Sequence, residues 1–213
     1  MEDKKIFLFG GTHPTIYHPF VSSFLPTDLQ GKKILDIGCG RGVWGYLLRT
    51  QRDVRKAEMI GVDASDYALS FVKKHRVYTK TLKIDIKKKL PFPDKSFDFI
   101  LCSEVIEHIV KKEGVKLLKE IDRLIKPGGR VIVTTPNVFL EMPYHDPLDL
   151  HRSLWTVKDF SSRGYKVKGI GVKLPFNKTG WQVFIIQALY YFITPFSYLF
   201  PQISGLLIAI KDY

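Results

Sequence analysis

The chain has 213 residues, and 45% of them are apolar, which is enough to fill a buried core and excludes a disordered chain. Its only cysteines, Cys39 and Cys102, stand far apart in apolar surroundings, which excludes a disulfide framework and a four-cysteine zinc site. The net charge of +12 fits either a lysine-rich solvated surface or contact with polyanions and anionic membranes.

Short apolar runs alternate with segments of helical periodicity from residue 31 onward. The apolar runs predict strands at Lys33–Ile37, Glu58–Asp63, Leu82–Ile84, Phe97–Cys102 and Arg130–Thr135. The helical spacing predicts helices at Val43–Arg49, Asp66–Lys74 and Val115–Ile125, with Lys126-Pro127-Gly128-Gly129 stopping the last one. This alternation predicts a doubly wound α/β sheet that binds its ligands at the carboxyl ends of the strands.

The two ends of the chain depart from this alternation. Residues 1–30 are rich in glycine and proline and are predicted to form a preface that lies across the ligand edge as a lid, before a main domain at residues 31–213. After Trp155 we expect a helix capped by Thr156, a strand at Tyr165–Val172 and a last strand at Leu206–Ile210.

An uncharged, aromatic-rich insertion at residues 179–204 precedes that last strand. Pro195 and the need for a final strand argue against a spanning helix. Burial in the core, a homodimer contact, docking on a membrane surface and an apolar acceptor pocket stay open. The first residues lack the pattern of a secretory signal, so we expect a cytosolic protein with an optional membrane contact.

The first predicted strand ends in a glycine-rich turn, Asp36-Ile37-Gly38-Cys39-Gly40-Arg41-Gly42. Alternate glycines let the backbone approach a ligand closely, and the next helix begins at once. Residues 40–45 also satisfy the dinucleotide spacing, so a nicotinamide enzyme is an alternative. Against it stands Asp36, which repels a pyrophosphate and attracts a ligand with an ammonium group.

Two more strand ends carry acidic side chains. Asp63 is placed to accept hydrogen bonds from both hydroxyls of a ribose, a feature that nicotinamide enzymes share. Asp85 follows the third strand and is placed to accept from an adenine amino group, with Ile86 packing against the ring. Together these ends predict a nucleoside site.

These motifs resemble the class I S-adenosylmethionine-dependent methyltransferases, especially the small group with a middle segment like LPFPDKSFDFILCSEVIEHI. The resemblance runs from about Lys33 to Asn137. It implies a Rossmann-like, mixed seven-stranded sheet whose last strand is antiparallel, and S-adenosyl-L-methionine as the cofactor. The cofactor contacts that it implies are Asp36, Gly38, Cys39, Gly40, Gly42, Asp63, Ala64, Asp85, Ile86, Ser103 and Glu104.

The acceptor side is less determined. The resemblance implies that His151, shortly before Trp155, closes over the active site, and we take it as the first candidate for acceptor contact or general base. His108 is the second catalytic candidate, with a structural helix-start role as its alternative. His13, Tyr17 and Tyr144 are candidate substrate contacts, although simple packing explains the first two equally well.

Residues 141–151 contain two histidines and three carboxylates, but their spacing does not fit a defined ligand geometry, so no metal is predicted. A buried, inert thiol is expected for Cys102. The basic residues are scattered and no appended nucleic-acid module is present. We therefore expect methyl transfer to a small-molecule or lipid-like acceptor, with RNA methylation and a non-catalytic cofactor-binding subunit as alternatives.

Overall fold

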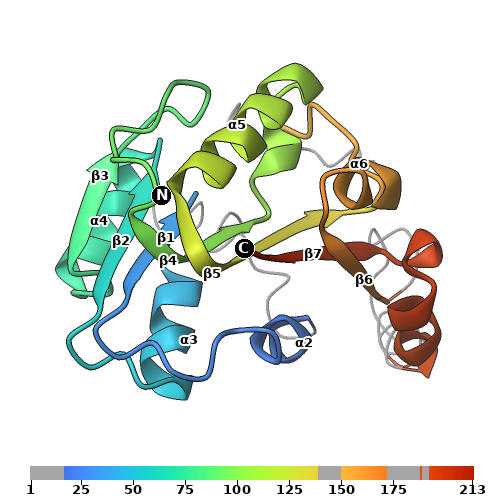
Figure 1. The fold of residues 1–213 in the computed structure, drawn as a ribbon, viewed down its shortest axis with the longest axis horizontal. Coiled ribbons are helices and arrows are strands. Elements are labelled where there is room, and N and C mark those ends of the chain that lie inside the picture. The colour runs from blue at the N-terminus through green and yellow to red at the C-terminus, as the bar shows by residue number, and fades with distance from the viewer. Residues whose placement is uncertain (1–16, 139–149, 172–187, 189–191) are drawn as a thin grey trace, which may run out of the picture.

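A seven-stranded sheet forms the centre of the computed structural model, which describes residues 17–138, 150–171, 188 and 192–213 (Figure 1). The strand order is β3-β2-β1-β4-β5-β7-β6. The strands are β1 Lys33–Ile37, β2 Glu58–Asp63, β3 Lys80–Lys83, β4 Phe97–Ser103, β5 Ile125–Pro136, β6 Lys166–Ile170 and β7 Leu206–Asp212. Strands β1 to β5 pair in parallel, whereas β7 is antiparallel to both β5 and β6. The predicted mixed sheet with an antiparallel last strand is confirmed.

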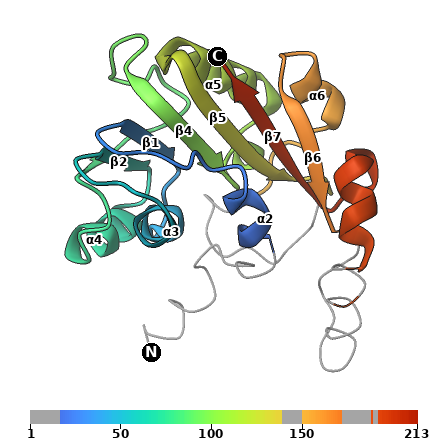
Figure 2. The same cartoon turned by 60° about the horizontal axis from the view of Figure 1, so that its bottom comes forward.

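Helices cover both faces of this sheet (Figure 2). The helices are α2 His18–Ser22, α3 Val43–Gln51, α4 Asp66–Lys74, α5 Lys111–Leu124 and α6 Val157–Ser161, with short 3₁₀ turns η1 Ile106–His108 and η3 Pro201–Ile203. One core cluster buries the apolar stripe of α5 together with Trp155 and Phe160. The second cluster lies on the opposite face and buries side chains of α2, α3 and α4. The sheet is therefore the middle layer of three.

Several element boundaries differ from the sequence predictions by one to five residues, and three of them have a clear physical reason. Strand β3 begins two residues earlier than predicted and lies at an edge with half-exposed residues, so its apolar pattern is weak. Helix α5 begins at Lys111, before the predicted start at Val115. The prediction misses the first turn because that turn is polar and carries none of the apolar stripe. Strand β5 already starts at Ile125, which pairs with Phe97, so the expected turn at Lys126–Gly129 lies inside β5 as a shift of register. The prediction that this turn precedes the strand is wrong, because pairing with β4 starts before the turn.

Residues 17–30 run along one face of the sheet. Val21, Leu25 and Leu29 are almost completely buried in the second core cluster. The guanidinium of Arg52 donates to the carbonyl of Ser22 at 2.5 Å, and that of Arg130 donates to the carbonyl of Phe24 at 3.0 Å. Residues 17–30 therefore pack on the same core as the strands that follow them.

The capped helix after Trp155 is confirmed. The hydroxyl of Thr156 accepts from the amide of Asp159, and the carboxylate of Asp159 accepts from the amide of Thr156. Of the insertion at 179–204, residues 192–199 are helical and η3 follows. Within the part of the chain that the structure describes, no helix has both the length and the apolar character to cross a membrane.

Candidate active site

The glycine turn predicted from the sequence connects β1 to α3 at the carboxyl end of the sheet. Gly38, Gly40 and Gly42 all have positive φ, at 68°, 48° and 82°. A Cβ on Gly38 would lie 2.2 Å from the side chain of Val105, whereas a Cβ on Gly40 would meet nothing within 4 Å. The turn is thus packed tightly against the residue after β4 at Gly38 and is open to an approaching ligand at Gly40.

Asp63 fixes this turn to the end of β2. One carboxylate oxygen accepts from the amide of Gly40 at 2.8 Å, and the other accepts from the amide of Ser65 at 2.8 Å. A carboxylate has about four acceptor positions, so about two stay available on Asp63. That capacity matches the pair of hydroxyls of a ribose.

Asp36 is a buried residue near the end of β1, just before the turn. Its side chain is 1% exposed and accepts a hydrogen bond of 2.5 Å from the hydroxyl of Tyr78. Burial raises the pKa of Asp36 to about 7, the charge of Asp63 adds to the rise, and the hydrogen bond from Tyr78 opposes it. The expected contact of Asp36 with an ammonium group, directly or through water, stays a prediction, and the bond from Tyr78 fixes the side chain that would make it.

The other expected cofactor residues stand at neighbouring strand ends. Cys39 is buried in the second core cluster and Ala64 is exposed. The Asp85 carboxylate accepts from the amide of Lys87 at 3.1 Å, and Ile86 packs against the first core cluster. Asp85 is thus oriented by its own turn next to the end of β3.

Two acidic side chains follow β4. Glu104 has φ of 54°, and its carboxylate accepts from the hydroxyl of Thr134 at 2.9 Å. That hydroxyl also lies 2.7 Å from the hydroxyl of Ser103. Burial raises the pKa of Glu104 to about 7, and the bond from Thr134 opposes this rise. Ser103 and Glu104 are therefore linked to β5 in one polar network at the carboxyl edge.

Glu107 lies at the same edge, directly before the candidate His108 in the sequence. Its side chain is 2% exposed, and its Oε2 accepts from the hydroxyl of Thr135 at 3.0 Å. Burial and the nearby Glu104 carboxyl raise the pKa of Glu107 well above its usual range. Tyr78, the partner of Asp36, is absent from the sequence predictions, because the residue that it contacts lies 42 positions away in the chain.

The two candidate catalytic histidines are brought together. The rings of His108 and His151 meet edge to face, with centroids 5.1 Å apart. Burial lowers the pKa of His151 to about 4, with the neighbouring His108 as a second cause. The two histidines and Glu107 offer ligand atoms that all lie within 4.8 Å of one another.

Of the three candidate substrate residues, Tyr17 alone lies within the described part of the chain. Tyr17 is buried and packs against His18, with ring centroids 4.7 Å apart. His13 and Tyr144 lie outside the described residues, as does most of the 141–151 segment apart from Leu150 and His151. Tyr17 stays a predicted substrate contact, with packing as its alternative.

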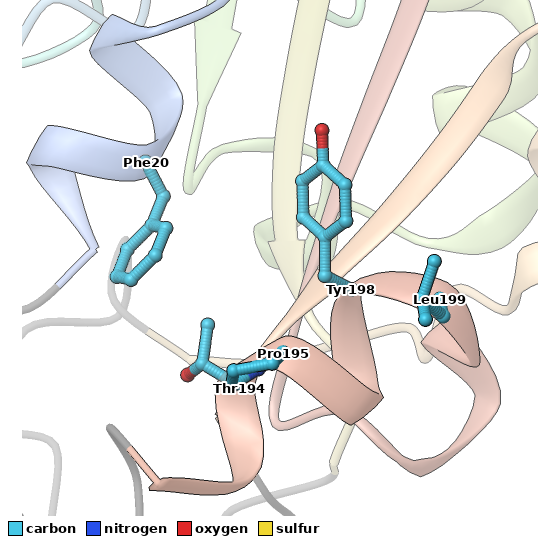
Figure 3. Close-up of a pocket in the computed structure, with 5 residues that line it drawn as sticks. All are labelled: Phe20, Thr194, Pro195, Tyr198 and Leu199. Carbon is cyan, nitrogen blue, oxygen red and sulfur yellow. The ribbon is translucent and has the colours of Figure 1, made fainter.

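An apolar groove opens between α2 and the helix of residues 192–199. Figure 3 shows Phe20 projecting from α2 across from the side chains of that helix. The groove encloses about 420 Å³ and is lined by Phe20, Thr194, Pro195, Tyr198 and Leu199. Residues after this helix lead into β7, whose first residue Leu206 pairs with Pro136 and Ile170, the last residues of β5 and β6. The groove therefore lies near the carboxyl edge of the sheet (Figure 2).

Comparison with known proteins gives consistent matches in the same region. Residues 35–133 match the family model described as "Methyltransferase domain". A ubiquinone biosynthesis O-methyltransferase from Dechloromonas aromatica is 34% identical over 114 residues, which are 52% of this chain and 47% of that protein. A fatty-acid O-methyltransferase from Mycolicibacterium smegmatis is 32% identical over 130 residues, which are 60% of this chain and 44% of that protein. The chain spans about half the length of these relatives.

The fold extends this similarity beyond the matched domain. The crystal structure of a SAM-dependent methyltransferase from Archaeoglobus fulgidus superposes with a TM-score of 0.63 at 20% sequence identity, over 92% of each chain. At that identity the likeness concerns the fold alone. The domain match, the glycine turn and the strand order agree with the motifs read from the sequence: residues 35–133 match a methyltransferase domain, and the chain has the fold of the S-adenosylmethionine-dependent methyltransferases.

Proposed function

We propose that this chain transfers a methyl group from S-adenosyl-L-methionine to a small-molecule or lipid-like acceptor. The observation that carries the proposal is the anchoring of Asp63 by the amides of Gly40 and Ser65. This arrangement leaves carboxylate oxygens of Asp63 able to accept hydrogen bonds from a ribose, beside a glycine turn that a ligand can approach closely. A nucleoside with an attached amino acid requires both features. Asp85 and Ile86 would complete the adenine end, and Ser103 and Glu104 the methionine end.

The cofactor supplies an activated methyl group on its sulfonium. The protein then has to hold an acceptor in line with that group and keep water away. The polar network around Glu104 and the pair of histidines stand at the ends of β4 and β5, where an acceptor would meet the cofactor. Because of this position, we assign His151 and His108 to binding of the acceptor.

The apolar groove supports a lipid-like acceptor. Its lining is aromatic and aliphatic, and it lies close to the same edge of the sheet. The two relatives are named for ubiquinone biosynthesis and for fatty acids, and a lipid-like acceptor for this chain agrees with those names. Lys168 lies over the ring of Tyr198, with its Nζ 4.2 Å from the ring centroid, so a cation stands at the rim of the groove.

Calorimetric titration with S-adenosylhomocysteine tests the cofactor half of the proposal. We expect Asp63→Ala to weaken binding about 10- to 100-fold, because it removes charge-assisted hydrogen bonds to the ribose. Asp66→Ala is the matched control, since Asp66 is an exposed aspartate three positions away that pairs with Lys83. Equal affinities of the two variants would remove the ribose assignment.

Incubation with methyl-labelled cofactor tests the acceptor half. We expect label in an extracted pool of metabolites and lipids and none in bulk RNA. Label in RNA would support the alternative acceptor instead. Binding of S-adenosylhomocysteine without transfer to either pool would favour a non-catalytic cofactor-binding subunit.

A further inference from the structure

Glu107, His108 and His151 form a cluster of metal-ligating side chains at the acceptor end of the sheet. The Nε2 atom of His108 lies 3.9 Å from Oε1 of Glu107, and all three offered ligand atoms lie within 4.8 Å of one another. Two imidazoles and one carboxylate are a donor set that zinc enzymes use with a fourth position left open. Tetrahedral zinc with nitrogen and oxygen ligands holds neighbouring ligand atoms about 3.3 Å apart, so ligand atoms that are now up to 4.8 Å apart would have to approach by up to about 1.5 Å.

A second observation points to a missing ligand at the same place. Oε1 of Glu107 is buried and has no hydrogen-bond partner among the described residues, whereas Oε2 accepts from Thr135. A buried carboxylate oxygen without a partner is costly. This oxygen is also the one that lies 3.9 Å from Nε2 of His108. A cation between them would satisfy it.

The surrounding hydrogen bonds orient the three side chains. The Nδ1 atom of His108 donates to the carbonyl of Leu150 at 3.3 Å, which leaves Nε2 as the coordinating nitrogen. The backbone carbonyl of Glu107 accepts from the amides of Arg152 and Ser153, at 2.7 and 3.1 Å. These bonds hold the segment that carries His151 against η1. The cluster is therefore assembled by the backbone and not by exposed, freely rotating side chains.

We propose that Glu107, His108 and His151 bind a divalent transition-metal ion of the zinc type, with an open position that takes an oxygen of the acceptor. The inference deepens the proposed function and rests on it, because it assigns the acceptor a hydroxyl group. It also revises the sequence prediction of no metal, which considered residues 141–151 and did not include Glu107.

The ion would make a hydroxyl acceptor reactive at neutral pH. A bound cation favours ionisation of the hydroxyl, whose proton passes to water. The oxygen then forms its bond to the methyl carbon as the S–CH3 bond breaks and the electron pair of that bond returns to sulfur. Atoms and charges balance without an oxidant or a further reactant.

Zinc binding by the full chain, stripped with a chelator and titrated with Zn²⁺ in a calorimeter, tests this site directly. We expect one ion per chain, and Glu107→Gln and His151→Gln should each weaken its binding at least about 100-fold. Thr135→Val, which removes only the hydrogen bond to Oε2, should weaken binding about 10-fold. His75→Gln is the matched control, because His75 is an exposed histidine at the end of α4. Binding that is absent, or equal in all variants, would overturn the proposal.

Two further readouts separate possible failures. Glu107 is buried, so thermal unfolding of Glu107→Gln is compared with the unmodified chain, and the half-exposed His151 provides the test if that variant does not fold. S-Adenosylhomocysteine titration is run on the same samples. Cofactor binding without zinc binding would refute the metal site alone, and absence of cofactor binding would refute the proposed function.

Discussion

The two halves of the sheet build their parts of the site in different ways. The β1–β3 half places Asp36, Asp63 and Asp85 at or just after successive strand ends, with the glycine turn between β1 and α3. The β4–β7 half assembles its polar groups from η1, β5 and the segment before Trp155, which are joined by backbone hydrogen bonds. The site residues of the first half follow from short sequence motifs, whereas those of the second half are brought together by tertiary contacts. The cofactor can therefore be inferred from the sequence, whereas the acceptor cannot.

The tight contact between the two halves gives the largest expected effect. Gly38→Ala would place a methyl group 2.2 Å from Val105, in a residue with φ of 68°. Left-handed strain and overpacking together should lower the free energy of unfolding by about 2–5 kcal/mol. Urea denaturation measures it, and cofactor binding should weaken in parallel.

Gly31→Ala is the control for this effect. Gly31 also has a positive φ, 65°, but a Cβ there meets nothing within 4 Å. Its loss should be limited to backbone strain of about 1–2 kcal/mol. Adding Val105→Ala should restore part of the stability of the Gly38 variant only. Equal losses in both glycine variants would contradict the packing role of Gly38.

The second prediction concerns the pH dependence of the buried acid in the cofactor half. Asp36 has its pKa raised to about 7, so the folded chain keeps this proton when the unfolded chain, with a usual pKa near 3.8, has released it. This contribution to stability is fully present below pH 3.8 and is lost as the pH rises to about 7. Asp36→Asn cannot titrate, and it keeps an oxygen that accepts from Tyr78.

Urea denaturation of both proteins between pH 4 and 8 measures this difference. We expect the variant to gain stability relative to the unmodified chain as the pH rises toward about 7, with a constant difference above that pH. Glu104→Gln should behave in the same direction on the acceptor side, because the pKa of Glu104 is also raised to about 7. A difference that does not change with pH would show that Asp36 is ionised throughout.

The same contrast explains what sequence could predict. The strands Lys33–Ile37 and Glu58–Asp63 and the helix Asp66–Lys74 coincide with their predicted bounds, because apolar periodicity and glycine or cap residues mark them. The half-exposed edge strand β3 and the polar first turn of α5 carry weak apolar patterns, so the predicted starts of both elements lie after the observed ones.

The contacts that the sequence does not predict have a different cause. Tyr78 donates to Asp36 across 42 positions, and Glu107 lies close to His151 in a segment where the amides of Arg152 and Ser153 donate to its carbonyl. Residue spacing predicts which side chains are close within one element, and it does not predict which residues from different elements the fold brings together. Asp63 was predicted because its place at a strand end is itself a local feature.

The smallest expected effect concerns the apolar groove of the acceptor half. Phe20→Ala removes an aromatic ring from the groove wall, and loss of part of its buried contact with an apolar acceptor should cost about 1 kcal/mol. That corresponds to a rise of about fivefold in KM for an acceptor with an apolar chain, with the Kd for S-adenosylhomocysteine unchanged. Phe192→Ala is the matched control, because Phe192 is 76% exposed and does not line the groove. An equal rise in KM for both variants would mean that general surface contact, and not the groove, receives the acceptor. Weaker binding of S-adenosylhomocysteine by Phe20→Ala would instead show that the groove contributes to the cofactor site of the β1–β3 half. The site would then not divide into a cofactor part set by local motifs and an acceptor part set by tertiary contacts.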